Sequence, residues 1–115
     1  MDRPLDPDPL DTFLVERYWP GVDLVQLRDA LPRLEAVARA MTAEGRRVEH
    51  VGSILMPVDE VVFSIIAAGD ESAVRQLNER AELPADRIAE AIALLSPITP
   101  ATGPDRDRRT TDDTR

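Results

Sequence analysis

The sequence predicts an α+β sandwich, in which two helices cover one face of a four-stranded antiparallel sheet. Two observations lead to this fold class. Apolar positions recur with a period of two or of three to four, in the order strand, helix, strand, strand, helix. In addition, residues 61–68 are apolar on both faces, which is typical of a central strand covered on both sides.

Residues 12–19 predict the first strand because their side chains alternate between two faces. One face carries Phe13, Val15, Arg17 and Trp19, and the other carries Leu14, Glu16 and Tyr18. A helix over 23–44 follows, with apolar residues every three or four positions and an N-cap pair in Asp23 and Gln26. Pro32 lies inside this pattern, so we expect it to kink the helix or to divide it.

Residues 46–56 predict the second strand, in which simple alternation places His50 on the same face as Gly52 and Ile54. After the third strand, Asp70 caps a second helix, which ends before Pro84. The segment 86–95 fits both a helix and a strand, and its Ala and Glu content favours a helix. Topology favours a strand over 87–94, since it completes a ferredoxin-like βαββαβ sandwich of sheet order 4-1-3-2.

The chain divides into one domain and two tails. With 115 residues, it has room for a single small core. Residues 1–11 are acidic and rich in proline, and residues 96–115 have no large hydrophobic residue after Ile98. Because such segments bury too little surface to offset their ordering entropy, we expect both tails to be disordered. The predicted domain therefore spans residues 12–95.

Composition excludes several classes of function. The absence of cysteine rules out thiolate metal sites and disulfides, and a single histidine rules out a multi-histidine zinc site within one chain. The net charge of −8 argues against a basic surface that would bind nucleic acid or an anionic membrane. No apolar run is long enough to cross a membrane, and the N-terminus does not look like a signal peptide. We therefore expect a cytoplasmic protein.

Several segments resemble a family of small, mostly actinobacterial proteins of unassigned function, which includes a nickel-binding, nickel-responsive member. The resemblance rests on residues 14–21, 52–57, 59–63, 73–75 and 79–88. Its most specific parts are Val-Glu-Arg in the first strand and Leu-Pro-Ala-Asp-Arg-Ile after the second helix. The resemblance implies a βαββαβ domain and pairing of open sheet faces, as in dimeric α+β barrels. It also implies nickel as a ligand, without assigning its donors.

His50 and Glu16 are the first candidate site residues. A lone imidazole acts as a general base or a metal ligand, or it is a strand histidine bonded to a carboxylate or carbonyl. Glu16 lies between Leu14 and Tyr18, where it either serves a ligand pocket or metal, or forms a salt bridge to Arg47 or Arg87. Both alternatives stay open for both residues.

Tyr18 and Trp19 are the second pair of candidates, because adjacent aromatic residues end the first strand. They form the lip of a ligand pocket or a dimer contact, or else Trp19 packs over the start of the helix as ordinary core. We expect a homodimer or a higher homo-oligomer, since two short helices cover one face of an apolar sheet and leave the other bare.

Three function classes remain. The first is a non-enzymatic protein that binds a small ligand or a transition metal such as nickel. Its metal ligands would be His50 and a carboxylate of Glu16 or Glu49, within or beside the dimer interface. The second is a cofactor-free isomerase, cyclase or monooxygenase of the dimeric α+β barrel type, with His50 or Glu16 as base. The third is an accessory protein-interaction module.

Overall fold

The structure is a computed structural model that describes residues 10–94. The two predicted tails lie outside the described residues, apart from Leu10 and from Asp11, which begins the first strand. None of the helices within residues 10–94 is long and apolar enough to cross a membrane.

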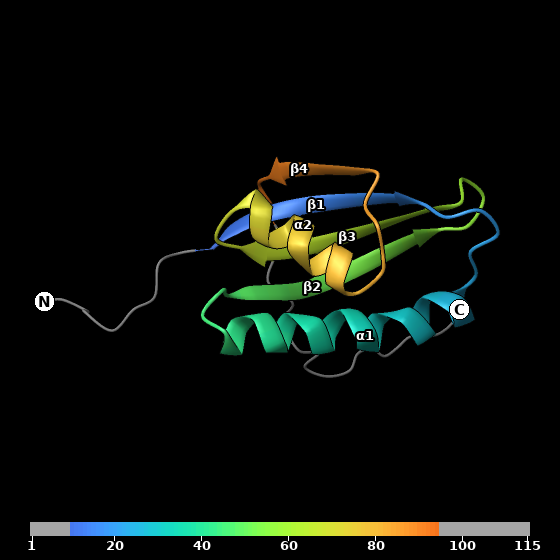
Figure 1. Cartoon of the computed structure of the whole chain (residues 1–115). Helices are drawn as coiled ribbons and strands as arrows, with labels where there is room; N and C mark the ends of the chain where they lie inside the picture. Colours follow the sequence, from blue (N-terminus) through green and yellow to red (C-terminus); the bar gives the residue numbers. More distant parts are fainter. Residues whose placement is uncertain (1–9, 95–115) are drawn as a thin grey trace, which may run out of the picture.

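Four strands and two helices follow one another in the predicted order. In chain order they are β1 (Asp11–Tyr18), α1 (Leu24–Ala43), β2 (Val48–Met56), β3 (Val61–Ala68), α2 (Glu71–Arg80) and β4 (Arg87–Ala91). The sheet order is β2-β3-β1-β4, and each neighbouring pair is antiparallel (Figure 1). The predicted ferredoxin-like βαββαβ fold is therefore confirmed.

The ambiguous last segment is a strand, although it is shorter than predicted. β4 ends at Ala91 rather than at Leu94. Just before β4, the Asp86 amide donates a hydrogen bond to the Glu16 carbonyl of β1 at 2.9 Å. The Asp86 carboxylate also accepts a hydrogen bond from the Tyr18 amide at 2.6 Å. Tertiary pairing at the free edge of β1 thus overrides the helical preference of this segment.

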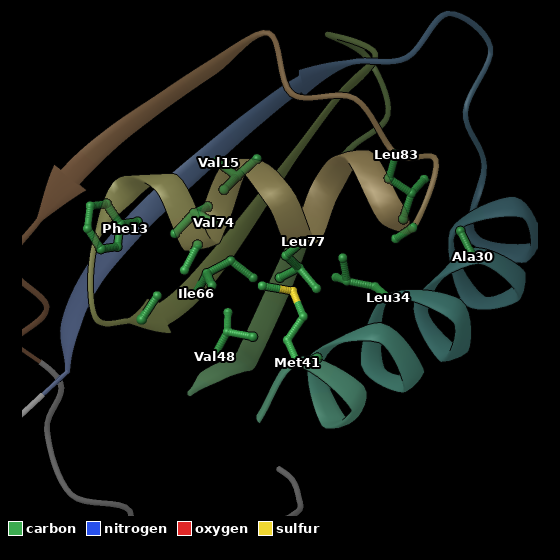
Figure 2. Packing of buried hydrophobic residues seen from close by; sticks show 14 residues of the cluster. Phe13, Val15, Ala30, Leu34, Met41, Val48, Ile66, Val74, Leu77 and Leu83 are labelled. Carbon is green, nitrogen blue, oxygen red and sulfur yellow. The ribbon is translucent and has the colours of Figure 1, made fainter. Parts of the chain in front are cut away.

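The core lies between one face of the sheet and the inward faces of both helices. Figure 2 shows it extending from Phe13 of β1 to Leu83, which follows α2. Central strand β3 contributes Ile66, and α1 contributes Leu34 and Met41, all fully buried. Because both helices pack on this face, no described element covers the other face of the sheet, which we call the open face.

Pro32 does not divide α1, which is one continuous helix of 20 residues. The expectation of two separate pieces is wrong. The side chain of Pro32 is exposed, so the backbone carbonyl that loses its amide partner lies on the solvent side of the helix. Water satisfies such a carbonyl at a modest cost.

A bulge in β2 changes which residues share a face. The register of β2 against β3 shifts between His50 and Gly52, so that His50 pairs with Ile66 and Ser53 pairs with Ser64. Beyond the bulge the alternation is therefore inverted. The expectation that His50 shares a face with Gly52 and Ile54 is wrong. His50 lies on the helix-covered face, whereas Gly52 and Ile54 lie on the open face.

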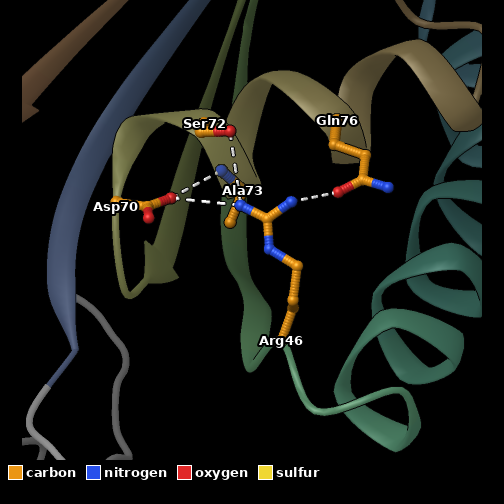
Figure 3. A network of polar contacts seen from close by, with 5 residues as sticks. All are labelled: Arg46, Asp70, Ser72, Ala73 and Gln76. Atoms are coloured by element: carbon orange, nitrogen blue, oxygen red, sulfur yellow. Dashed lines mark hydrogen bonds and ion pairs between the residues drawn. The ribbon is translucent and has the colours of Figure 1, made fainter.

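Arg46 connects the α1–β2 loop to the start of α2 (Figure 3). Its guanidinium donates to the Asp70 carboxylate at 3.2 Å and to the Gln76 side-chain oxygen. Asp70 also accepts a hydrogen bond from the Ala73 amide at 2.8 Å, as an N-cap does. One arginine therefore holds the N-terminus of α2 against the end of α1.

The end of α2 is a Schellman motif that contains a strained residue. The Glu82 amide donates to the Glu79 carbonyl at 3.1 Å, and the Leu83 amide donates to the Asn78 carbonyl at 2.9 Å. This turn requires a left-handed residue between helix and strand, and Glu82 occupies that position with φ of 58°. The motif directs Leu83 into the core, where it is buried.

We expect Glu82→Gly to stabilise the protein. Glycine removes the left-handed strain of about 1–2 kcal/mol and costs about 0.5–1 kcal/mol in unfolded-state entropy. The free energy of unfolding should therefore rise by about 0.5–1 kcal/mol, which raises Tm by a few degrees. Thermal unfolding followed by circular dichroism measures the change. As a control, Glu79→Gly within α2 should lower stability by about 1 kcal/mol. A lower Tm for Glu82→Gly would contradict the assignment.

Candidate functional site

A chain of polar side chains crosses the layer between sheet and helices. Arg17 Nη1 donates to Ser64 Oγ at 2.9 Å, and Ser64 Oγ lies 2.7 Å from Ser53 Oγ. Ser53 Oγ lies 2.8 Å from Nε2 of His50, whose Nδ1 lies 3.1 Å from Glu35 Oε2. The chain therefore links β1, β3, β2 and α1 in that order.

One assignment of protons satisfies every member of this chain. A guanidinium has donors only, so Ser64 accepts from Arg17 and is free to donate its own proton to Ser53. Ser53 then donates to Nε2 of His50, which leaves the Nδ1 proton for the Glu35 carboxylate.

Arg17 is the buried end of the chain. Besides Ser64, its guanidinium donates to the Leu83 carbonyl at 3.2 Å and to the Asn78 side-chain oxygen. Burial lowers the pKa of Arg17 to about 10, and the negative charge of Asp86 opposes this shift. Desolvation of the charge thus outweighs the attraction of the nearest acid.

His50 faces a groove between α1 and the edge strand β2. The groove has a volume of about 450 Å³, and its lining includes Glu35, Arg39, Thr42, Glu49 and His50. The His50 side chain is only 6% exposed, whereas that of Glu35 is 48% exposed. His50 is a strand histidine whose ring contacts a carboxylate, and that carboxylate belongs to Glu35.

Of the two carboxylates that the sequence offered as partners of His50, the structure separates Glu16 from it and leaves Glu49 in the same groove. Glu16 lies on the open face, because it pairs across the strands with Phe63, and its carboxylate is 3.7 Å from Arg87. The predicted salt bridge between Glu16 and Arg87 is therefore present. Glu49 lies beside His50, with its carboxylate 3.7 Å from Arg47. Within residues 10–94, no three acidic, histidine or cysteine residues cluster as a metal site.

Sequence reasoning missed Glu35. Its position on the outward side of a helix looks like that of any solvated acid, and its distance to His50 depends on how α1 packs against β2. A helical spacing with Arg39 was the only sequence signal, and such pairs are common on exposed helices. The pairing of Glu35 with His50 thus required the tertiary structure.

A second cavity lies at the end of β1, where it meets α1 and the α2–β4 loop. Its volume is about 460 Å³, and its lining includes Arg17, Tyr18, Trp19, Arg33 and Leu83. Trp19 also packs against both clusters of the hydrophobic core, so its side chain contributes to the core and lines the cavity as well. Tyr18 is exposed, and its hydrogen bond to Glu60 raises the pKa of its hydroxyl.

Comparison with known proteins identifies the family. A family model described as "Nickel responsive protein SCO4226-like" matches residues 13–91. The fold is similar to the crystal structure of SCO4226 from Streptomyces coelicolor A3(2), with a TM-score of 0.63 and 22% sequence identity. That match covers 73% of this chain and 99% of the other. No curated protein matches. Because the family model spans nearly all of the described residues, this chain belongs to the SCO4226-like family of nickel-responsive proteins.

Proposed function

We propose that this protein binds Ni²⁺ in the groove between α1 and β2, with His50 and Glu35 as the first donors. The proposal rests on one observation, the distance of 3.1 Å between Nδ1 of His50 and a carboxylate oxygen of Glu35. Imidazole nitrogen suits nickel, and a carboxylate supplies negative charge. The family description as nickel responsive supports the choice of metal.

The donor set of one chain fits a weak site. Tight binding of a transition metal usually takes three or four protein ligands. Glu49 lines the same groove and offers a third donor, and water or a second copy would complete the coordination. Arg39 also lines the groove, and its positive charge opposes binding of a cation. We therefore expect a dissociation constant of about 10–100 µM for the isolated protein.

The polar chain behind His50 supports metal binding. Coordination through Nδ1 requires the remaining proton on Nε2, where it donates to Ser53. Ser53 then turns its own proton toward Ser64, whose oxygen accepts from both Ser53 and Arg17. Such an outer hydrogen bond fixes the orientation of the ring and raises the basicity of the ligating nitrogen.

We also propose that two copies pair through their open faces. This face carries the apolar side chains of Leu14, Ile54, Met56, Val61, Phe63 and Ile65. Among them, Ile54 is 54% exposed and Met56 is 40% exposed. An apolar sheet face of this extent is unusual on a monomer. If two copies pair about a two-fold axis, the open face of each is buried against that of the other. Glu16 lies on this face, so any metal role for Glu16 belongs to the dimer interface.

We predict that nickel binding depends on both groove donors. In calorimetry with protein purified without a metal-affinity tag, His50→Ala should abolish binding, and Glu35→Gln should weaken it about tenfold. Acidification should also weaken binding, because a protonated imidazole does not coordinate. Glu90→Gln is the matched control, since it removes one carboxylate on β4, at the opposite edge of the sheet.

Two results would contradict the nickel site. One is equal binding by the wild type and by His50→Ala. The other is a dissociation constant weaker than about 100 µM for the wild type together with no response to acid. Heteronuclear spectra of each variant verify that the fold is retained.

We predict that wild-type protein sediments as a dimer at micromolar concentration. Ile54→Asp should shift it toward the 12.7 kDa monomer, because two buried carboxylates would face each other across the axis. Val58→Asp is the control, since Val58 is 94% exposed in the β2–β3 turn, outside the open face. Sedimentation velocity measures both variants. A wild-type monomer would refute the pairing.

A further inference from the structure

The cavity at the end of β1 contains two arginines that lack an acidic partner. Arg17 and Arg33 both line it. Within residues 10–94, neither guanidinium is within ion-pairing distance of a carboxylate. Asp29 precedes Arg33 by one helical turn and lines the same cavity, yet the two form no ion pair. Neither arginine of this cavity therefore has its positive charge neutralised by a direct ion pair.

Arg17 is the more unusual of the two because it is 5% exposed. Its acceptors are all neutral, namely the Leu83 carbonyl, the Ser64 hydroxyl and the Asn78 side-chain oxygen. A guanidinium has five N–H donors, so acceptors remain to be supplied. Burying a cation that forms no direct ion pair costs free energy, and the lowered pKa of Arg17 reflects this desolvation, which the charge of Asp86 offsets only in part.

Arg33 occupies the α1 side of the cavity. Its Nε donates to the Ala81 carbonyl at 2.6 Å, which fixes the side chain toward the end of α2. This single bond leaves the two terminal nitrogens for a ligand. A planar guanidinium with both terminal nitrogens available is well suited to a bidentate contact with a carboxylate.

Five of the other lining residues are apolar or aromatic. Trp19, Pro20, Ala30, Leu83 and Pro84 line the cavity together with the arginines. The volume of about 460 Å³ falls within the range of small-molecule sites. A flat apolar group would contact Trp19, while a charged group would contact the arginines.

We propose that this cavity binds a small aromatic or similarly flat organic monoanion, with its carboxylate on Arg33 and Arg17 and its apolar body against Trp19. A single negative charge fits better than a phosphate dianion, because Asp29 and Glu82 also line the cavity and would repel a second charge. The site is separate from the His50 groove and does not depend on nickel.

Trp19 provides a direct test because it is the only tryptophan in the chain. Its indole N–H gives one isolated signal in a ¹H–¹⁵N spectrum, and benzoate serves as the probe. Titration should shift this signal in a saturable way, with a dissociation constant below about 5 mM. Benzyl alcohol, which keeps the ring but has no charge, should bind at least tenfold more weakly. Inorganic phosphate should produce no saturable shift.

Arg33→Gln should weaken benzoate binding at least tenfold, and Arg28→Gln is the control on the exposed surface of the same helix. Equal affinity for benzoate and benzyl alcohol would overturn the proposal, as would unchanged affinity in Arg33→Gln. Absence of a saturable shift up to about 10 mM benzoate would also overturn it. Nickel binding is measured separately by calorimetry, and Arg33→Gln should leave the nickel affinity unchanged.

Discussion

The buried guanidinium of Arg17 is the constraint on which the interior of this domain depends. Arg17 is the only charged residue among the buried residues of the described part of the chain. It contacts β3 through Ser64, α2 through Asn78 and the α2–β4 loop through Leu83. A buried charge tolerates only arrangements that supply its acceptors, since leaving them unmade costs several kcal/mol. These contacts fix where α2 ends and where β4 begins.

The same residue also relates the two cavities to each other. Arg17 lines the cavity at the end of β1, and the hydrogen bonds through Ser64 and Ser53 reach His50 in the groove beside β2. Both cavities therefore border a single polar layer that runs through an otherwise apolar core. Within this layer Ser64, Ser53 and His50 are each hydrogen-bonded on two sides, which restricts their orientation.

The bulge in β2 is the local feature that makes this layer possible. Without it, Ser53 would point to the open face, and His50 would have no neighbour that relays a hydrogen bond to Ser64. With it, His50 and Ser53 both face the helices. The bulge thus separates the apolar open face, which carries Ile54 and Met56, from the polar residues beneath the helices.

The sequence by itself determined the order and type of the elements. Period-two and helical patterns are local properties, and they identified β1 to β3, both helix caps and the central position of β3. It also offered a pocket as one role of Tyr18 and Trp19, and Arg87 as one of two partners of Glu16, and the structure shows a cavity and that salt bridge. These results follow from spacing along the chain or from pairing across a known sheet order.

Only the tertiary structure decided the extent of β4, the continuity of α1 through Pro32, the face of His50 and the identity of its partner. Each depends on contacts between residues far apart in sequence. β4 is a strand because β1 offers an unpaired edge, and Glu35 meets His50 because α1 packs beside β2. A one-residue bulge leaves almost no signal in composition, yet it inverts every later side chain of the strand. Local periodicity cannot detect such a shift, because the residues that stabilise it lie on other elements.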